Sequence, residues 1–193
     1  MLQQRGRVLA WLAVLFVLAS GSRGGESSMP TFVPWKVLNP GDEPLKNDLV
    51  LYWVPSTRDE IRRSPLLTSR PLAIYSTQCV GMQIVRPDDA EMIAKLSAGQ
   101  RPIAILASID GTIVARIGGT FRLVDIERMV RDAITDRESS ADHLLDDAKS
   151  RVDSGDRDAA IALYRRVCTQ KCLLPRKARD AQKALKKLGV NER

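Results

Sequence analysis

The sequence has little of the material from which catalytic and metal sites are commonly built. Its 193 residues include one histidine, His143, and three cysteines, and aromatic residues make up 5% of the chain. A structural zinc site is disfavoured because no second cysteine pair accompanies Cys168 and Cys172. The chain also lacks a phosphate-binding glycine loop, an H-E-x-x-H, a G-x-S-x-G and an N-x-S/T acceptor. We therefore expect neither a metal nor a cofactor.

Long apolar runs are absent except at the N-terminus, where Val8–Ala19 carries no charge. Arg5 and Arg7 precede this run, and Ala19-Ser-Gly21 offers small residues for cleavage, so residues 1–21 have the pattern of a signal peptide. The run is short for a membrane-spanning helix, and a retained anchor is the alternative. We expect a secreted protein, or one of the periplasm or cell envelope, in a compartment that permits disulfides.

Positive charge is concentrated in the last quarter of the chain. The formal net charge is +7, and the segment from Arg151 to the C-terminus has 12 Lys and Arg against 5 Asp and Glu. Such a surface can meet an anionic membrane or an acidic protein, although a solvated helix face is the ordinary interpretation. Nucleic acid is not expected because no aromatic residues are interleaved with the charges. The basic residues are Lys171, Arg176, Lys177, Arg179, Lys183, Lys186 and Lys187.

In the first half of the chain, residues 22–47 predict a proline-rich leader, and the end of this leader can form a first strand. The apolar run Leu49–Val54 then predicts a buried strand. Thr57 and Glu60 then have the spacing of a capping box, which predicts a helix start and a Glu60 carboxylate bound to the N-cap amide. Pro65 should kink this helix rather than end it. The stretch after Pro65 stays ambiguous because Arg70-Pro71 favours a break.

The middle of the chain predicts further strands and helices. Val80–Val85 is typical of a parallel strand, and Asp88 should cap a helix that continues through Leu96. Two strands, 103–107 and 112–117, flank Asp110-Gly111 and predict a hairpin. Apolar residues from Ile126 to Ile134 follow helical spacing and predict the last helix of this part.

At these positions the chain resembles the thioredoxin family. The similarity covers about residues 37–135 and rests on a series of features at the family's spacings: Tyr52-Trp53 at the strand end, Thr57 and Glu60 at the two cysteine positions, Pro65 at the kink, Arg101-Pro102-Ile103 at the cis-proline, Asp110-Gly111 in the hairpin and Gly118-Gly119 after it. The resemblance implies a thioredoxin-like α/β domain at residues 48–135, with a mixed sheet and flanking helices. It also implies a degenerate site made of Trp53, Thr57, Glu60 and Pro102.

The chain departs from that family where the chemistry takes place. Thioredoxin chemistry requires a low-pKa thiolate at the helix start and a second thiol that resolves the mixed disulfide. Threonine forms no thiolate, and glutamate cannot resolve a disulfide. The expected function is therefore that of a catalytically silent protein-interaction or scaffold module with an unidentified protein partner. The alternative is a thiol-dependent redox protein that uses Cys79 or the Cys168/Cys172 pair.

Beyond residue 135 the pattern becomes helical. Residues 135–141 are a linker or a solvated continuation of the preceding helix, and the next helix should stop at Gly155. Asp156 should cap a second helix, and Pro175 and Gly189 should bound a third. The pattern Gly155-Asp-x-x-Ala-Ala-Ile-x-x-Tyr164 resembles half of a tetratricopeptide repeat, so residues 142–190 should form a helical hairpin that packs on the domain or pairs with another chain.

The cysteines and the histidine are the remaining candidates for chemistry. Cys79 should be a small buried hydrophobe or a free thiol, with a reactive thiol or an intermolecular bridge as alternatives. A bridge between Cys168 and Cys172 is the preferred interpretation of that pair, provided that the helix ends near Cys168. His143 lies among Asp142, Asp146 and Asp147, which is more typical of a solvated helix face than of acid–base catalysis.

Overall fold

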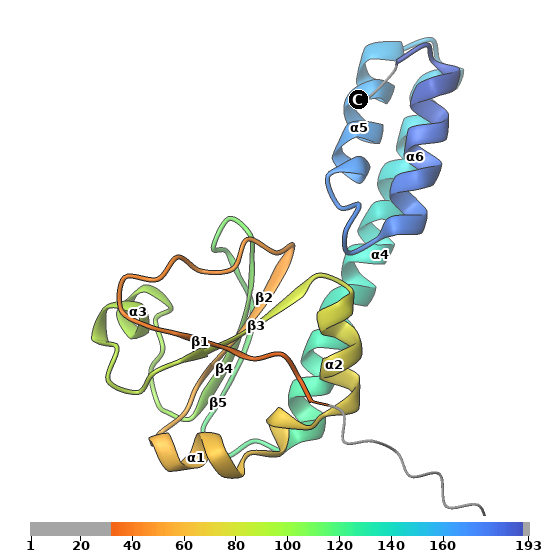
Figure 1. Ribbon diagram of the computed structural model, residues 1–193. Coiled ribbons are helices and arrows are strands. Elements are labelled where there is room, and N and C mark those ends of the chain that lie inside the picture. The colour runs from red at the N-terminus through yellow and green to blue at the C-terminus, as the bar shows by residue number, and fades with distance from the viewer. Residues whose placement is uncertain (1–31, 191–193) are drawn as a thin grey trace, which may run out of the picture.

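The computed structural model describes residues 32–190, so the predicted signal peptide lies outside the described residues. It shows a five-stranded mixed sheet with flanking helices and an all-α C-terminal extension (Figure 1), which confirms the predicted fold class. The strands are β1 (Lys36–Leu38), β2 (Leu49–Val54), β3 (Val80–Val85), β4 (Ile103–Ser108) and β5 (Ile113–Gly118). Their order is β1-β3-β2-β4-β5. Strands β1 and β2 run parallel to β3, whereas β4 is antiparallel to β2 and β5. This order is consistent with a thioredoxin-like sheet.

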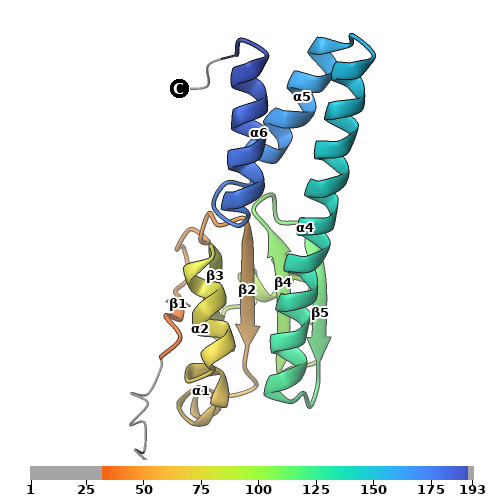
Figure 2. The same ribbon diagram turned by 90° about the vertical axis from the view of Figure 1, so that its right-hand side faces the viewer.

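The central strand β2 is buried along its whole length because helices cover both faces of the sheet. Its side chains alternate, as the period of a strand requires. Leu49, Leu51 and Trp53 join the core beneath α2 (Arg70–Thr77) and α4 (Leu123–Asp153), which lie on one face of the sheet in Figure 2. Val50, Tyr52 and Val54 join a smaller core on the other face, which is shared with α3 (Ala90–Lys95).

The helix that begins after β2 is broken into three pieces. Helix α1 spans Arg58–Arg63, a 3-10 turn spans Pro65–Leu67, and α2 starts at Arg70. The predicted kink at Pro65 is therefore an end, because Pro65 lacks the amide hydrogen that would continue the helix. Ser64 and Ser69 provide new caps, since their hydroxyls accept from the amides of Leu66 and Leu72.

Two further expectations differ in detail. The N-cap of α3 is Asp89 rather than Asp88, and its carboxylate accepts from the Met92 amide at 3.0 Å. Asp88 instead forms ion pairs with two arginines. Of the two alternatives for residues 135–141, the helical continuation is confirmed and the linker is wrong, because α4 runs unbroken for 31 residues. Its first half packs on the sheet domain and its second half on the C-terminal helices, so each half buries an apolar face.

The C-terminal extension consists of the second half of α4 together with α5 (Arg157–Cys168) and α6 (Pro175–Lys187). The predicted boundaries at Gly155, Asp156, Pro175 and Gly189 are confirmed. Gly155 has φ +80, a conformation that glycine adopts without strain. The Asp156 carboxylate accepts from the Ala159 amide at 3.3 Å. Within residues 32–190, no helix has both the length and the apolar character needed to cross a membrane.

Candidate functional site

The tip of α1 lies at the carboxyl end of β2, beside the only cis peptide bond among residues 32–190. That bond joins Arg101 to Pro102, directly before β4. In the antiparallel pairing of β2 with β4, Val54 is opposite Ile103, so the turn after β2 lies beside Pro102. The structure thus brings Trp53, Thr57, Glu60 and Pro102 to one edge of the sheet. The sequence did not indicate whether the peptide bond before Pro102 is cis or trans.

The polar groups of the tip cap the helix. Thr57 has extended backbone angles, and its hydroxyl accepts from the Glu60 amide at 3.3 Å. The Glu60 carboxylate accepts from the Ser56 amide at 2.8 Å, one residue before the predicted N-cap amide. The capping box therefore differs from the prediction in one hydrogen bond: the Glu60 carboxylate binds the Ser56 amide instead of the Thr57 amide. Both side chains serve the backbone of the turn, as helix-capping groups do.

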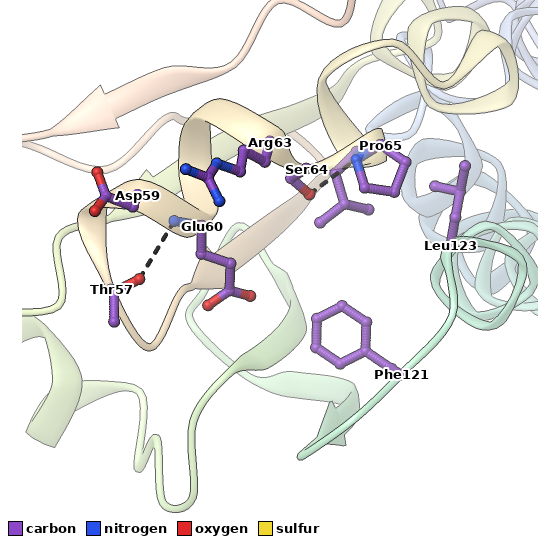
Figure 3. Close-up of a pocket in the computed structure, with 9 residues that line it drawn as sticks. Thr57, Asp59, Glu60, Arg63, Ser64, Pro65, Phe121 and Leu123 are labelled. Atoms are coloured by element: carbon purple, nitrogen blue, oxygen red, sulfur yellow. Dashed lines mark hydrogen bonds between the residues drawn. The ribbon is translucent and has the colours of Figure 1, made fainter.

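Beside the tip lies a hollow of about 430 Å³ between α1 and the segment that leads into α4. Glu60 and Phe121 extend toward this space from opposite sides in Figure 3, and Arg63 and Leu123 also line it. The hollow is open to solvent, and its polar groups come mainly from α1. It contains no cysteine and no histidine.

An exposed charge network borders the tip. The Asp88 carboxylate accepts from Arg86 at 2.8 Å and from Arg58 at 2.7 Å. The hydrogen bonds from Arg86 and then from Arg58 hold the pKa of Asp88 well below its usual range. Arg101 donates to the Pro87 carbonyl at 2.7 Å and fixes the loop that precedes the cis peptide. The network orients the loops around the tip.

Trp53 lies behind the tip as part of the core. It is fully buried, and its ring lies edge-on to Trp35 with 6.0 Å between the ring centroids. Trp35 donates to the Leu66 carbonyl at 2.9 Å, whereas the indole Nε1 of Trp53 has no hydrogen-bond partner among the described residues. Trp53 therefore supports the turn by packing and offers no surface to a ligand.

The cysteines are paired differently from the prediction. Cys79 is bonded to Cys172, with 5.7 Å between their Cα atoms, whereas Cys168 lies outside the disulfide and is half-buried. The expectations of a Cys168–Cys172 bridge and of a free Cys79 are therefore wrong. Helix α5 does end at Cys168, as that bridge required, but the following turn carries Cys172 to the loop between α2 and β3. Nothing in the local sequence signals a pairing across 93 residues.

The disulfide lies at the opposite edge of the sheet from the tip. Cys79 precedes Val80, which pairs with Leu49 at the start of β2, whereas the tip follows Val54 at its end. The length of β2 separates them by about 17 Å at the usual rise per residue. A hydrogen bond of 3.1 Å from the Leu173 amide to the Asp48 carboxylate reinforces the junction there. The bridge joins the C-terminal helices to the sheet and adds no thiol to the tip.

The remaining candidates lie on exposed helix surfaces. His143 is exposed on α4, while its neighbour Asp142 pairs with Lys177 of α6. Asp146 pairs with Lys149 at 2.8 Å. Most of the predicted basic residues lie on the solvent-facing side of α6, and Lys171 is exposed in the turn before it. No group of acidic, histidine and cysteine side chains suited to a metal occurs among residues 32–190.

Comparison with protein-family models and with curated proteins finds no match to this sequence.

Proposed function

We propose that this chain is an exported, catalytically silent protein of thioredoxin-like type that acts as a protein-interaction or scaffold module. The observation that carries the proposal is the presence of Thr57 and Glu60 at the helix tip beside cis-Pro102, where a redox member of that family has two thiols. Neither side chain can form a mixed disulfide with a substrate. Both side chains cap the helix, so the tip has the helix start of a thioredoxin-like site but lacks its thiol chemistry.

The position of the disulfide supports the same proposal. Cys79 and Cys172 are bonded to each other at the far edge of the sheet, and their bridge closes a large loop between the sheet and the extension. A bridge of this kind stabilises a structure by restricting the unfolded chain. The C-terminal helices are thereby held on the domain, and they present an exposed surface formed by α5 and α6 to a protein partner.

The test is a dithiol-dependent insulin reduction assay on the purified protein and on two designed variants. The variant Thr57→Cys/Glu60→Cys places a C-x-x-C at the N-cap and third position of α1. The matched control Asp156→Cys/Ala159→Cys places the same motif at the same positions of α5, away from the α1 tip. We expect no turnover by the wild type, gain of turnover by the first variant, and at most a small gain by the control.

Turnover by the wild-type protein at thioredoxin-like rates would overturn the proposal. If that turnover were abolished by Cys79→Ser or Cys172→Ser, the thiol-dependent redox alternative would replace it. Equal activity of the two designed variants would argue against a retained thioredoxin-like site, because the surroundings of the α1 tip would then contribute nothing to the activity.

A further inference from the structure

One side of α6 carries a continuous row of basic side chains. The row follows the helical spacing i, i+3, i+7, i+10 and i+11, which places its members on one face of the helix. All of them are exposed, and the row extends for about 16 Å at the usual rise of a helix. We call it the α6 stripe, and its residues are Arg176, Arg179, Lys183, Lys186 and Lys187.

The chain does not neutralise the α6 stripe. Lys183 pairs with Asp180 at 3.4 Å, and both side chains are exposed. The other members have no carboxylate partner among residues 32–190. A second acid, Asp153 of α4, lies across the groove that Lys183 and Lys187 line. Five cations against these two carboxylates leave an excess of three positive charges on this side of the extension.

The opposite face of α6 is committed to packing. Ala181 and Leu185 are fully buried in the core that α6 shares with α5. The helix therefore has no spare apolar face to insert among lipid acyl chains, unlike an interfacial amphipathic helix. Contact of the α6 stripe with a charged layer would leave this packing unchanged. Since α6 forms an outer side of the extension in both views (Figures 1 and 2), a planar surface can reach the stripe.

The composition of the α6 stripe favours lipid headgroups over a folded protein as its partner. Between Arg176 and Lys187 every exposed residue is charged, apart from Gln182. The cores of protein interfaces are depleted in lysine and are built around apolar or aromatic anchors, which the stripe does not offer. A layer of anionic headgroups needs no such anchor, because the attraction depends on the sum of the charges within about a Debye length.

We propose that the α6 stripe holds the protein on an anionic lipid bilayer. The basic side chains lie among the phosphate headgroups, and α6 lies parallel to the membrane plane. The α1 tip lies at the opposite edge of the sheet from the extension, so it stays accessible to a protein partner. This inference goes beyond the proposed scaffold function and does not depend on it.

The test is co-sedimentation of the purified protein with vesicles of phosphatidylglycerol and phosphatidylcholine in equal parts, and with vesicles of phosphatidylcholine alone. We expect binding to the anionic vesicles only, strong at about 0.01 M salt and lost at about 1 M salt. Each Lys or Arg close to an anionic surface contributes about fivefold to the partition. The variant Arg179→Gln/Lys186→Gln/Lys187→Gln should therefore weaken binding about a hundredfold.

The matched control is Lys36→Gln/Arg62→Gln/Lys95→Gln, which removes three exposed cations of the sheet domain and changes the net charge equally. We expect it to bind close to the wild type, since these positions lie outside the stripe. Both variants change exposed residues only, so they should keep the wild-type circular dichroism.

Three results would overturn the proposal: no binding to the anionic vesicles at low salt, equal binding to both kinds of vesicle, or equal weakening in the two triple variants. Binding to soluble polyglutamate without binding to vesicles would also overturn it and would assign the stripe to an acidic protein. None of these results bears on insulin reduction, so failure here leaves the scaffold proposal to its own test.

Discussion

Removal of the Cys79–Cys172 disulfide should destabilise the whole protein rather than release the C-terminal helices alone. The variant is Cys79→Ala/Cys172→Ala. Cys79 has φ +62, and alanine at this position bears the same backbone strain, so the substitution isolates the loss of the bridge. Cys168→Ala is the matched control, since it removes a thiol without breaking the bridge.

The magnitude follows from the size of the loop that the bridge closes. With a sequence separation of 93 residues, the chain-entropy relation gives about 4.7 kcal/mol at 25 °C. That is a large share of the roughly 5–15 kcal/mol that stabilises most folded proteins. At about 2–4 °C per kcal/mol for a chain of this size, the melting temperature should fall by about 10–20 °C.

The loss should be global because the junction is part of the main core. Leu173 and Leu174 are buried in the same cluster as Leu49 and Leu51 of β2. Helix α4 also runs without interruption from the sheet into the extension. Without the bridge, the native contacts remain and the unfolded chain gains freedom, so the effect acts mainly on the unfolded state.

The measurement is urea unfolding of the wild type, the double variant and the control, each followed by circular dichroism and by tryptophan fluorescence. We expect coincident transitions by both probes, a lower free energy of unfolding for the double variant, and a steeper denaturant dependence because its unfolded state exposes more surface. Cys168→Ala should stay close to the wild type. A loss below about 1 kcal/mol in the double variant, or mass-spectrometric detection of a Cys168–Cys172 bridge in the wild type, would refute this reasoning.

Three further predictions concern single side chains. Thr57→Ala removes the hydroxyl that accepts from the Glu60 amide and should lower the free energy of unfolding by about 0.5–2 kcal/mol in a urea titration, whereas Thr57→Ser should retain most of it. Leu185→Ala empties a fully buried position of α6 and should cost about 2–5 kcal/mol, and a cost equal to that of the exposed Lys186→Ala would contradict the observed packing. Asp88→Asn should lower the melting temperature near neutral pH, because Arg86 and Arg58 hold the pKa of the Asp88 carboxyl low in the folded protein. The stability that the ionised Asp88 contributes is fully present above the unfolded-state pKa of about 3.9. It is lost as the pH falls toward the folded-state pKa. The difference between Asp88→Asn and wild type should therefore shrink below about pH 4, and a difference that does not depend on pH would count against this charge network.

Local chemistry explains why many element boundaries could be predicted. Gly155 and Gly189 end helices because each takes a positive φ that other residues avoid. Pro175 begins a helix because the first turn needs no amide hydrogen there. Thr57 and Asp156 cap helices through hydrogen bonds made within four residues. In each case the partners are close in sequence, so the pattern contains the whole interaction.

Two local predictions went wrong because neighbouring residues compete for the same role. Asp88 and Asp89 can both cap α3, and the arginines Arg58 and Arg86, brought close by the fold, engage Asp88. Glu60 has two amides within reach, and its carboxylate takes that of Ser56. Sequence spacing does not distinguish such alternatives, since they differ by one residue.

The sequence by itself determined the main strands, several of the helix ends, the polar character of the α1 tip and the basic charge of the C-terminal segment, because these depend on side chains and on partners a few residues away. The tertiary structure alone decided which cysteines meet and the unbroken course of α4. Those features join segments that are distant in the chain. Their geometry follows from how β2, β3 and α4 pack, and packing is a property of the whole fold.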